Sequence, residues 1–327
     1  KLFKPRDAKL FKPRNALGNT GGQYYVAENP TFGAVFTYHL KDVPETMKSK
    51  RKKAEASLNK ENKDIPFPGY ESLTQEMREK PATLLLSISD SGGNLIRNVN
   101  QRASKGTGKI VWDLKHKSYY TITARSGWRE STGPFVTPGK YSATLYLKKD
   151  GELEKLDGPI EFGVKLLREG VLKGASFEEY NSHASELATI YKEYSVYSDT
   201  FSRLQSKFNL LEKALMLTES LNENMFSELE KVKNEYLTIR DKYGTNPAKN
   251  EIGEWDKPTI GSRLSIASQG LSTFYGPTEM NKYNLELSKK LVSDYKKDVE
   301  LINSKVEDLE KRIKELNHPH ISGSGIN

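Results

Sequence analysis

The side chains that most often hold metals or move protons are few and scattered in this chain. There is no cysteine, which excludes thiolate catalysis, disulfide bonds and cysteine-ligated zinc. The five histidines are His39, His116, His183, His318 and His320. None is four residues from another, the spacing that places two histidines on one face of a zinc-binding helix. His318 and His320 flank a proline in a tail that we expect to be solvated. The sequence therefore predicts no metal site and no cofactor.

Carboxylates are abundant, yet their spacing defines no pair for acid–base chemistry. Glycoside hydrolysis needs two converging carboxyl groups, whereas residues 307–315 mix acidic and basic side chains as a solvated helix face does. Two carboxylates from distant segments could still converge in space. Residues 104–109 resemble a phosphate-binding loop, but a predicted strand follows them instead of an anion-binding helix N-terminus. The Gly-x-Ser-x-Gly motif is absent. We therefore expect no catalytic residue and predict that this chain is not an enzyme.

Three aromatic residues of one predicted loop are the candidate ligand-binding residues. Tyr119, Tyr120 and Trp128 lie in the long segment that precedes Pro138-Gly139. Aromatic side chains on loops bind sugars or peptides through their flat apolar faces. The alternative is that these side chains pack on the sheet. If they share one exposed surface, the expected ligand is a glycan.

The charge of the chain suggests an anionic partner without identifying it. The formal net charge is +8, and charged residues make up 29% of the chain. Lysine and arginine concentrate at residues 48–53, which either contact an acidic surface or, as we favour, form a solvated helix face. No basic–aromatic motif of a nucleic-acid-binding module is present, so nucleic acid is not an expected partner. No apolar run is long enough for a membrane span.

Short alternating segments in the first half predict a β-sandwich. Residues 111–114 (Val-Trp-Asp-Leu) end one apolar run, and residues 138–141 (Pro-Gly-Lys-Tyr) make a turn into an alternating strand. This combination is typical of immunoglobulin-like sandwiches, and we expect Trp112 in the core. The sandwich is assigned to residues 23–168, with a helical or irregular insertion at residues 43–80.

Apolar residues at three- and four-residue steps predict long helices in the second half. One helix carries Phe201, Leu204, Phe208 and Leu211, and another carries the heptad stripe Val299, Ile302, Val306, Leu309 and Ile313. Heptad spacing is typical of helices that pack side by side. We expect the two stripes to face each other in an antiparallel helical bundle over residues 175–318. Ser176, with Glu179 three residues later, predicts a capping box at the start of this region.

These patterns predict an α+β chain of several domains. Residues 1–22 are interpreted as a linker and residues 319–327 as a flexible tail. Two octads fill residues 1–16 and differ only at Asp7 against Asn15. Two copies are too few for a repeat fold. We interpret them either as a local duplication or as an extended basic linker that follows an upstream domain.

Five motifs, in their order, resemble the C-terminal portion of one protein family. They are residues 10–14 (Leu-Phe-Lys-Pro-Arg), 28–38 (Glu-Asn-Pro-Thr-Phe-Gly-Ala-Val-Phe-Thr-Tyr), 105–114, 138–141 and 258–264 (Pro-Thr-Ile-Gly-Ser-Arg-Leu). The family consists of bacterial exported proteins with a large sortilin-like β-propeller, often labelled glycosyl hydrolase or BNR-repeat proteins. There, a sandwich similar to the flagellar-hook-capping immunoglobulin-like domain follows the propeller, and a helical region comes last. The resemblance therefore implies an exported protein that is periplasmic, outer-membrane-associated or on the cell surface.

The resemblance carries no catalytic residue onto this chain. The hydrolase label of the family belongs to its propeller repeats, and their Asp-box (Ser-x-Asp-x-Gly-x-x-Trp) is absent here. We therefore expect a non-catalytic structural and interaction region that supports an upstream β-propeller domain and binds a protein or cell-surface partner. One alternative is a glycan-binding accessory region of a carbohydrate-active enzyme, which Tyr119, Tyr120 and Trp128 would serve. Another is a helical adaptor that binds an acidic protein surface.

Overall fold

Alternation of side chains produces the strands of the first half. Side chains in a strand point to opposite faces in turn, and Leu84, Leu86 and Ile88 are fully buried while the residues between them are partly exposed. The turn that follows is built by Asp90, whose carboxylate accepts hydrogen bonds from backbone N–H groups at residues 92 and 94, at 2.9 and 2.8 Å. The sequence Asp-Ser-Gly-Gly-Asn at residues 90–94 predicts a hairpin turn, and the structure has one there.

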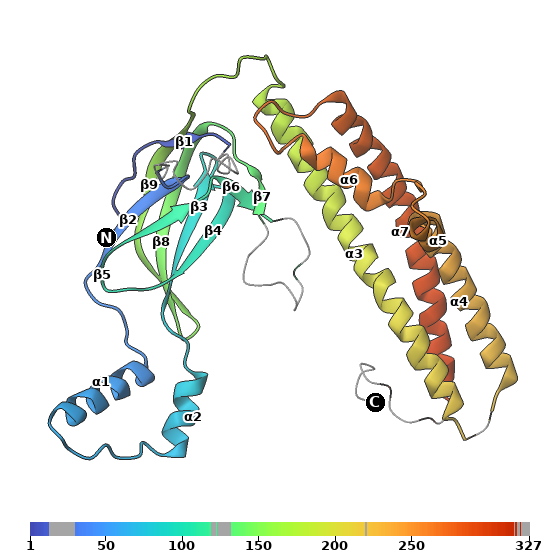
Figure 1. The fold of residues 1–327 in the computed structure, drawn as a ribbon, viewed down its shortest axis with the longest axis horizontal. Coiled ribbons are helices and arrows are strands. Elements are labelled where there is room, and N and C mark those ends of the chain that lie inside the picture. The colour runs from blue at the N-terminus through green and yellow to red at the C-terminus, as the bar shows by residue number, and fades with distance from the viewer. Residues whose placement is uncertain are drawn as a thin grey trace. The chain divides into compact units, whose positions relative to one another are not determined.

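The computed structural model describes residues 1–12, 30–118, 122, 132–219, 221–316, 318 and 321. Over these residues the protein is a mixed α+β chain that divides into two compact units (Figure 1). The first unit holds the described residues of Lys1–Ser118 and Thr132–Val171, and the second holds Ile122 and the described residues of Leu172–Asn327.

The first unit contains the strands. They are β1 (Ala8–Leu10), β2 (Ala34–Leu40), β3 (Thr83–Asp90), β4 (Leu95–Arg102), β5 (Gly106–Trp112), β6 (Lys115–Lys117), β7 (Thr132–Phe135), β8 (Gly139–Lys149) and β9 (Glu152–Leu166). One curled sheet has the order β1-β9-β8-β3-β4, and β2-β5 and β6-β7 form two-stranded pairs. Neighbouring strands are antiparallel, apart from the parallel pair β1 and β9.

Aromatic rings build the core of the first unit. Trp112 is fully buried, and its ring meets those of Tyr141 and Phe162 at centroid distances of 5.5 and 6.0 Å. Its Nε1 donates a hydrogen bond to the carbonyl oxygen of Lys115 (3.0 Å). Phe36 of β2 also meets Phe162 edge-on, at 5.1 Å. These contacts pack the β2-β5 pair on the five-stranded sheet, and the predicted burial of Trp112 is confirmed.

The N-terminal segment belongs to the first unit and is not a linker. Leu2 forms an isolated bridge with Tyr38 of β2, and Leu10 ends β1, which pairs with β9. Both leucines are buried, and they are the equivalent residues of the two octads. The interpretation of residues 1–22 as a linker is wrong for residues 1–10, because burying one leucine per octad stabilises the segment against the sheets. Residues 13–22 lie outside the described residues.

Two helices, α1 (Met47–Lys60) and α2 (Tyr70–Arg78), lie between β2 and β3. The sequence predicts a helix over the lysine-rich part of the insertion, where α1 is found. It also predicts an irregular stretch where α2 is found, because Pro66, Pro68 and Pro81 surround that stretch. These prolines lie outside α2 and therefore do not interrupt it.

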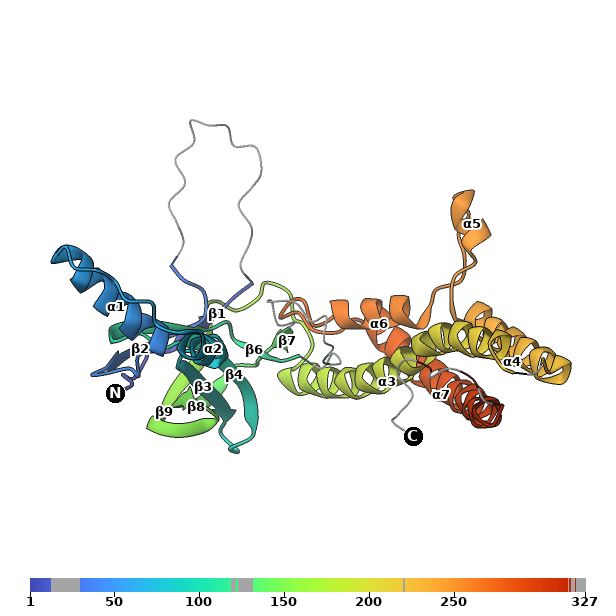
Figure 2. The same ribbon diagram turned by 90° about the horizontal axis from the view of Figure 1, so that it is seen from below.

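The second unit is helical. Its helices are α3 (Phe177–Met216), α4 (Glu223–Tyr243), α5 (Pro247–Glu251), α6 (Ile260–Gln269) and α7 (Glu279–Lys314). The predicted capping box is present, since Glu179 and Ser176 exchange backbone-to-side-chain hydrogen bonds of 3.1 Å. α3, α4, α6 and α7 share one hydrophobic core, which includes the predicted heptad stripe, whereas α5 stands away from them (Figure 2). None of the helices in the described residues is long and apolar enough to span a bilayer.

α3 and α7 run parallel, so the predicted antiparallel arrangement of these two helices is wrong. Polar contacts between them join residues that are 103 positions apart: Glu179 with Lys282, Glu186 with Lys289 and Tyr197 with Glu300, at 3.2, 2.5 and 2.9 Å. A constant offset means that both helices advance in the same direction.

The return path of the chain explains this direction. α4 runs antiparallel to α7, since Glu235 pairs with Lys305 and Lys242 pairs with Asp298, at 2.5 and 2.8 Å. After α6 the chain is back at the start of α3, where the hydroxyl of Tyr180 donates to the carbonyl oxygen of residue 271 (3.0 Å). α7 therefore begins at the same end as α3. A heptad stripe predicts which face is buried, but apolar faces pack in either direction.

Candidate interaction surface

α1 is a basic helix that no core residue holds in place. Thr46 caps its N-terminus by accepting a hydrogen bond from the backbone N–H of Ser49 (3.2 Å). The helix has five lysines and one arginine against a single glutamate, and none of its residues is buried. Since α1 lacks an apolar stripe facing a core, its position depends on a small number of ion pairs.

Arg51 of α1 and Glu76 of α2 link the two helices. The guanidinium donates through Nε and Nη2 to the two carboxylate oxygens of Glu76, at 2.7 and 2.8 Å, the two-pronged geometry of a strong charge-assisted pair. Arg51 also donates to Glu55 within α1 (2.6 Å). The hydrogen bond from Arg51 lowers the pKa of Glu76, and the bond to Glu76 raises the pKa of Arg51. Both groups therefore stay charged at neutral pH.

The C-terminal end of α2 is anchored to α1 and to the sheet. The carboxylate of Glu79 accepts a hydrogen bond from the backbone N–H of Met47, the first residue of α1, at 2.5 Å. The same carboxylate lies 3.7 Å from the ammonium group of Lys149 in β8. The two helices are thus fixed to each other at two points and to the sheet at their base.

The polarity of α2 is inverted relative to an ordinary surface helix. Its buried residue is Glu76, at 9% exposure, whereas Tyr70 and Met77 are 81% and 87% exposed. Tyr70 and Met77 are seven residues apart and therefore share one face of the helix. Phe67 and Ile65 in the preceding irregular segment are also exposed, and the ring of Phe67 meets that of Tyr70 at 5.0 Å. We call Ile65, Phe67, Tyr70 and Met77 the α2 strip.

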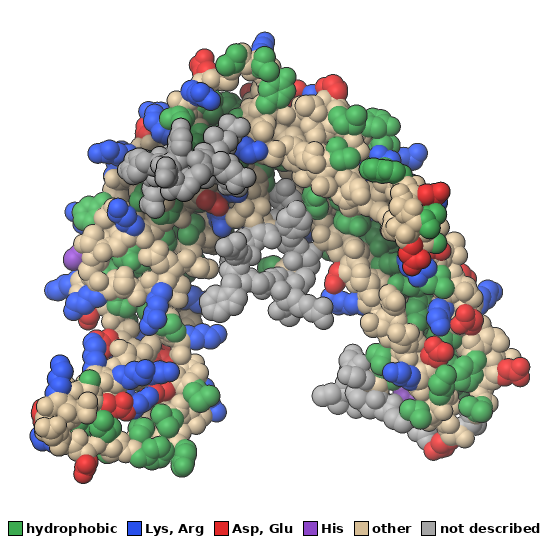
Figure 3. All heavy atoms as spheres, viewed as in Figure 1, with side chains coloured by type: hydrophobic (Ala, Val, Ile, Leu, Met, Phe, Trp, Pro, Cys, Tyr) green, Lys and Arg blue, Asp and Glu red, His purple; other side chains and the backbone are tan. Residues whose placement is uncertain are grey.

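Exposed lysines of α1 add positive charge to the α1–α2 region. Lys48, Lys50 and Lys52 are exposed, and no carboxylate in the described part of the chain forms an ion pair with them. Figure 3 shows basic side chains beside exposed apolar ones on the visible face of the α1–α2 region. An exposed apolar patch rimmed by polar residues marks an interaction surface, and the free lysines make this one electropositive.

Sequence reasoning missed the α2 strip, although a signal for it was present. Tyr70, Thr74 and Met77 follow the spacing of a helix face, but the prolines before and after them favour an irregular segment. The apolar face points to solvent because Arg51 of α1 holds Glu76, on another face of α2, inward. Sequence periodicity alone does not reveal this partner.

The predicted ligand-binding residues Tyr119, Tyr120 and Trp128 lie outside the described residues. Their role in binding a glycan stays a prediction. Ile122 in the same segment is described and is exposed.

The histidines that the structure describes have separate environments. His183 is buried, with Nε2 2.9 Å from the carbonyl oxygen of Ala267, and this contact ties α3 to α6. Burial lowers the pKa of His116, and His39 is exposed, with Nδ1 3.1 Å from the hydroxyl of Thr107. Within the described residues, no three His, Asp or Glu side chains converge as metal ligands would.

Comparison of this chain with protein-family models, with curated proteins and with solved structures finds no match.

Proposed function

We propose that this chain is a non-catalytic interaction region of a larger exported protein, and that its α1–α2 insertion docks on a protein partner. The observation that carries the proposal is the inverted α2 helix, with Glu76 held inward by Arg51 and Tyr70 and Met77 turned outward. The partner that fits presents an apolar depression for the α2 strip and acidic side chains for the lysines of α1.

Both parts of the surface have a physical role in docking. Burying apolar area stabilises a complex by about 25 cal/mol per Å² before the costs of association, and aromatic residues and methionine are enriched at interface cores. Phe67 and Tyr70 already touch each other, so less side-chain freedom is lost when they bind. The lysines attract an acidic partner and orient it before contact.

The remainder of the chain supports this surface. In the proposal, the strands form an immunoglobulin-like β-sandwich and the helices of the second unit form a bundle. The contacts of Phe36 and Trp112 with Phe162 support the sandwich, and the core shared by α3, α4, α6 and α7 supports the bundle. The motifs similar to exported sortilin-like proteins support an upstream β-propeller domain in the whole protein.

Photo-cross-linking tests the proposal. Benzoylphenylalanine replaces Met77 in the purified chain, which is then irradiated in an envelope extract of the source cells. Leu153 of β9 is the matched control position, because it is also an exposed apolar residue. We expect one protein to be cross-linked from position 77 and not from position 153. High salt, which screens surface charges, and the variant Lys48→Glu/Lys52→Glu should both lower the yield.

Three results would contradict the proposal. They are the absence of a cross-link from position 77, equal yields from both positions, and a yield that does not depend on salt or on the lysines. Cross-links to lipid in place of protein would identify an anionic membrane surface as the occupant and would also overturn it.

A further inference from the structure

α4 and α6 follow one another along α7 and leave a gap between them. At the end of α4, Lys242 pairs with Asp298 (2.8 Å), and in α6, Arg263 donates to Asn284 (3.3 Å). α6 therefore lies nearer than α4 to the N-terminus of α7. Residues 244–259 connect α4 to α6 and include α5, which stands away from the other helices (Figure 2).

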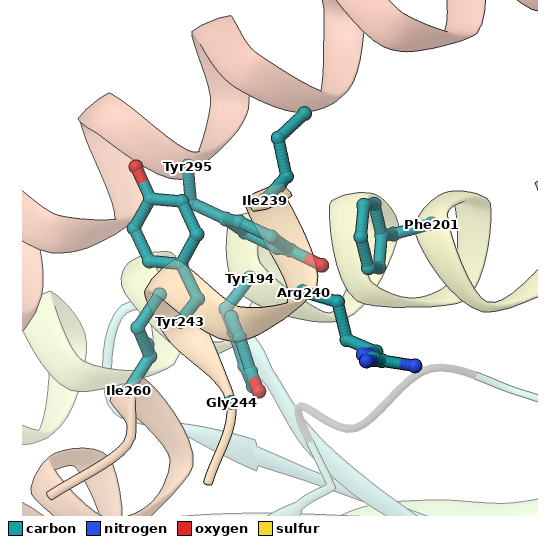
Figure 4. A pocket seen from close by; sticks show the side chains of 8 residues that line it. All are labelled: Tyr194, Phe201, Ile239, Arg240, Tyr243, Gly244, Ile260 and Tyr295. Atoms are coloured by element: carbon teal, nitrogen blue, oxygen red, sulfur yellow. The ribbon is translucent and has the colours of Figure 1, made fainter. Parts of the chain in front are cut away.

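A cavity of about 140 Å³ lies at this gap. Side chains from α3, α4, α6 and α7 converge on it (Figure 4), namely Tyr194, Phe201, Ile239, Arg240, Tyr243, Ile260 and Tyr295, together with the backbone of Gly244. Gly244 begins the segment 244–259 and Ile260, the first residue of α6, directly follows it, so the cavity lies where this segment separates α4 from α6. Most of the wall is aromatic or aliphatic.

Tyr295 brings a hydroxyl group to this wall. It is only 5% exposed, and its ring meets those of Tyr243 and Phe201 at 4.9 and 5.8 Å. Its hydroxyl forms no hydrogen bond with any residue that the structure describes, whereas the hydroxyl of Tyr243 donates to Asp298 (2.7 Å). Burial raises the pKa of Tyr295, so its hydroxyl stays protonated. A ligand with an acceptor can therefore take the hydrogen bond of this hydroxyl in place of water.

The size and the charges of the cavity select its ligand. A cavity of about 150 Å³ lined by apolar side chains accommodates a molecule the size of benzene, and aromatic walls favour an aromatic ring in edge-to-face contact. The guanidinium of Arg240 already donates to Asp241 (3.0 Å). Since this cation is paired, the cavity favours a neutral ligand over an anion.

We propose that the cavity binds a single aromatic ring with a neutral hydrogen-bond acceptor, and that the hydroxyl of Tyr295 donates to that acceptor. The ring belongs to a separate molecule. Trp255, in the segment 244–259, is 96% exposed, and its fused two-ring indole is larger than the benzene-sized molecule that a cavity of this size accommodates.

Two ring compounds of the same shape provide the test. Anisole carries an ether oxygen as acceptor, and ethylbenzene has a methylene group in its place. Their affinities for the full chain are measured by NMR titration. We expect the hydrogen bond to the hydroxyl of Tyr295 to raise the affinity of anisole relative to that of ethylbenzene about fivefold. In Tyr295→Phe, which removes only the hydroxyl, the ratio of the anisole affinity to the ethylbenzene affinity should fall by this factor, because the more apolar ethylbenzene then keeps only its advantage in leaving water.

Further variants separate binding in the cavity from binding elsewhere. Ile260→Trp should fill the cavity and abolish binding of both compounds, while Val196→Trp, at an exposed site of α3, should leave binding intact. Circular dichroism confirms that each variant keeps its helices. An affinity ratio that is the same in the unaltered chain and in Tyr295→Phe, or binding that survives in a folded Ile260→Trp, would overturn the proposal. Trp255→Ala should leave the affinity for anisole unchanged, and a rise would identify Trp255 as the occupant instead of a separate molecule.

Discussion

The burial of Trp112 could be predicted from the sequence, whereas the burial of Glu76 could not. Trp112 ends an apolar run in a motif typical of sandwich cores, so its complete burial could be predicted. Glu76 is a charged residue in a polar segment, and nothing near it in the sequence indicates burial. It is buried because Arg51, 25 residues earlier, satisfies both carboxylate oxygens, and such a distant pairing is decided by tertiary structure.

Replacing Trp112 should destabilise the first unit strongly. Trp112→Ala removes a ring that contacts Tyr141 and Phe162, and such a change in a packed core costs about 3–5 kcal/mol. The free energy of unfolding is measured by urea titration with near-UV circular dichroism. Trp255→Ala is the control, since this exposed side chain should change stability by less than about 0.5 kcal/mol. Similar effects of the two substitutions would show that Trp112 is not a core residue.

The link between α1 and α2 should depend on pH. The pKa of Glu76 is lowered below its ordinary value of 4.5 by the hydrogen bond from Arg51. A carboxylate with a depressed pKa stabilises the folded state above its ordinary pKa, and this stabilisation is lost as the pH falls through the lowered value. NMR shifts of the α1 amides should therefore stay constant down to pH 4.5 and change below it. Glu76→Gln should remove this transition, and the exposed Glu71→Gln should retain it. An unchanged transition in Glu76→Gln would refute the link.

At the scale of elements, the sequence predicts which face of a helix is buried better than it predicts whether two packed helices run parallel or antiparallel. The spacing of Val299, Ile302, Val306, Leu309 and Ile313 identifies the buried side of α7, and all five residues are in the core. It does not determine that α3 and α7 are parallel, because this follows from α4 and α6 lying between them in the chain. The ion pairs between α3 and α7 show that the two helices are parallel. The partners in these pairs can be identified only when the positions of the helices are known.

Zero-length cross-linking should confirm the parallel pair. A carbodiimide joins a carboxylate directly to an amine in contact with it, and Glu186 and Lys289 meet at 2.5 Å. Mass spectrometry should find this link, together with Glu235 to Lys305 between α4 and α7. A link from Glu186 to Lys305 would instead indicate the antiparallel arrangement of α3 and α7.

At the scale of the whole molecule, the change of pattern along the chain predicts a strand-rich first half and a helical second half, and the structure confirms this mixed α+β character. The involvement of Leu2 and Leu10 in the first unit was not predicted, because two isolated leucines in a basic segment carry no periodicity. The position of the α1–α2 insertion could be predicted from the switch to lysine-rich composition after β2. Its exposed α2 strip could not, since that depends on how the two helices pair.

The most direct test of the central claim measures affinity and stability together in one variant. Tyr70→Ser/Met77→Ser removes two exposed side chains of the α2 strip while keeping the Arg51–Glu76 pair. Affinity is measured for the protein cross-linked from position 77, and thermal unfolding is followed in parallel. We predict at least a tenfold loss of affinity, about 1.4 kcal/mol, with an unchanged melting temperature, because exposed apolar groups contribute little to folding. Unchanged affinity, or a melting temperature that falls by several degrees, would contradict the claim that this strip is an interaction surface.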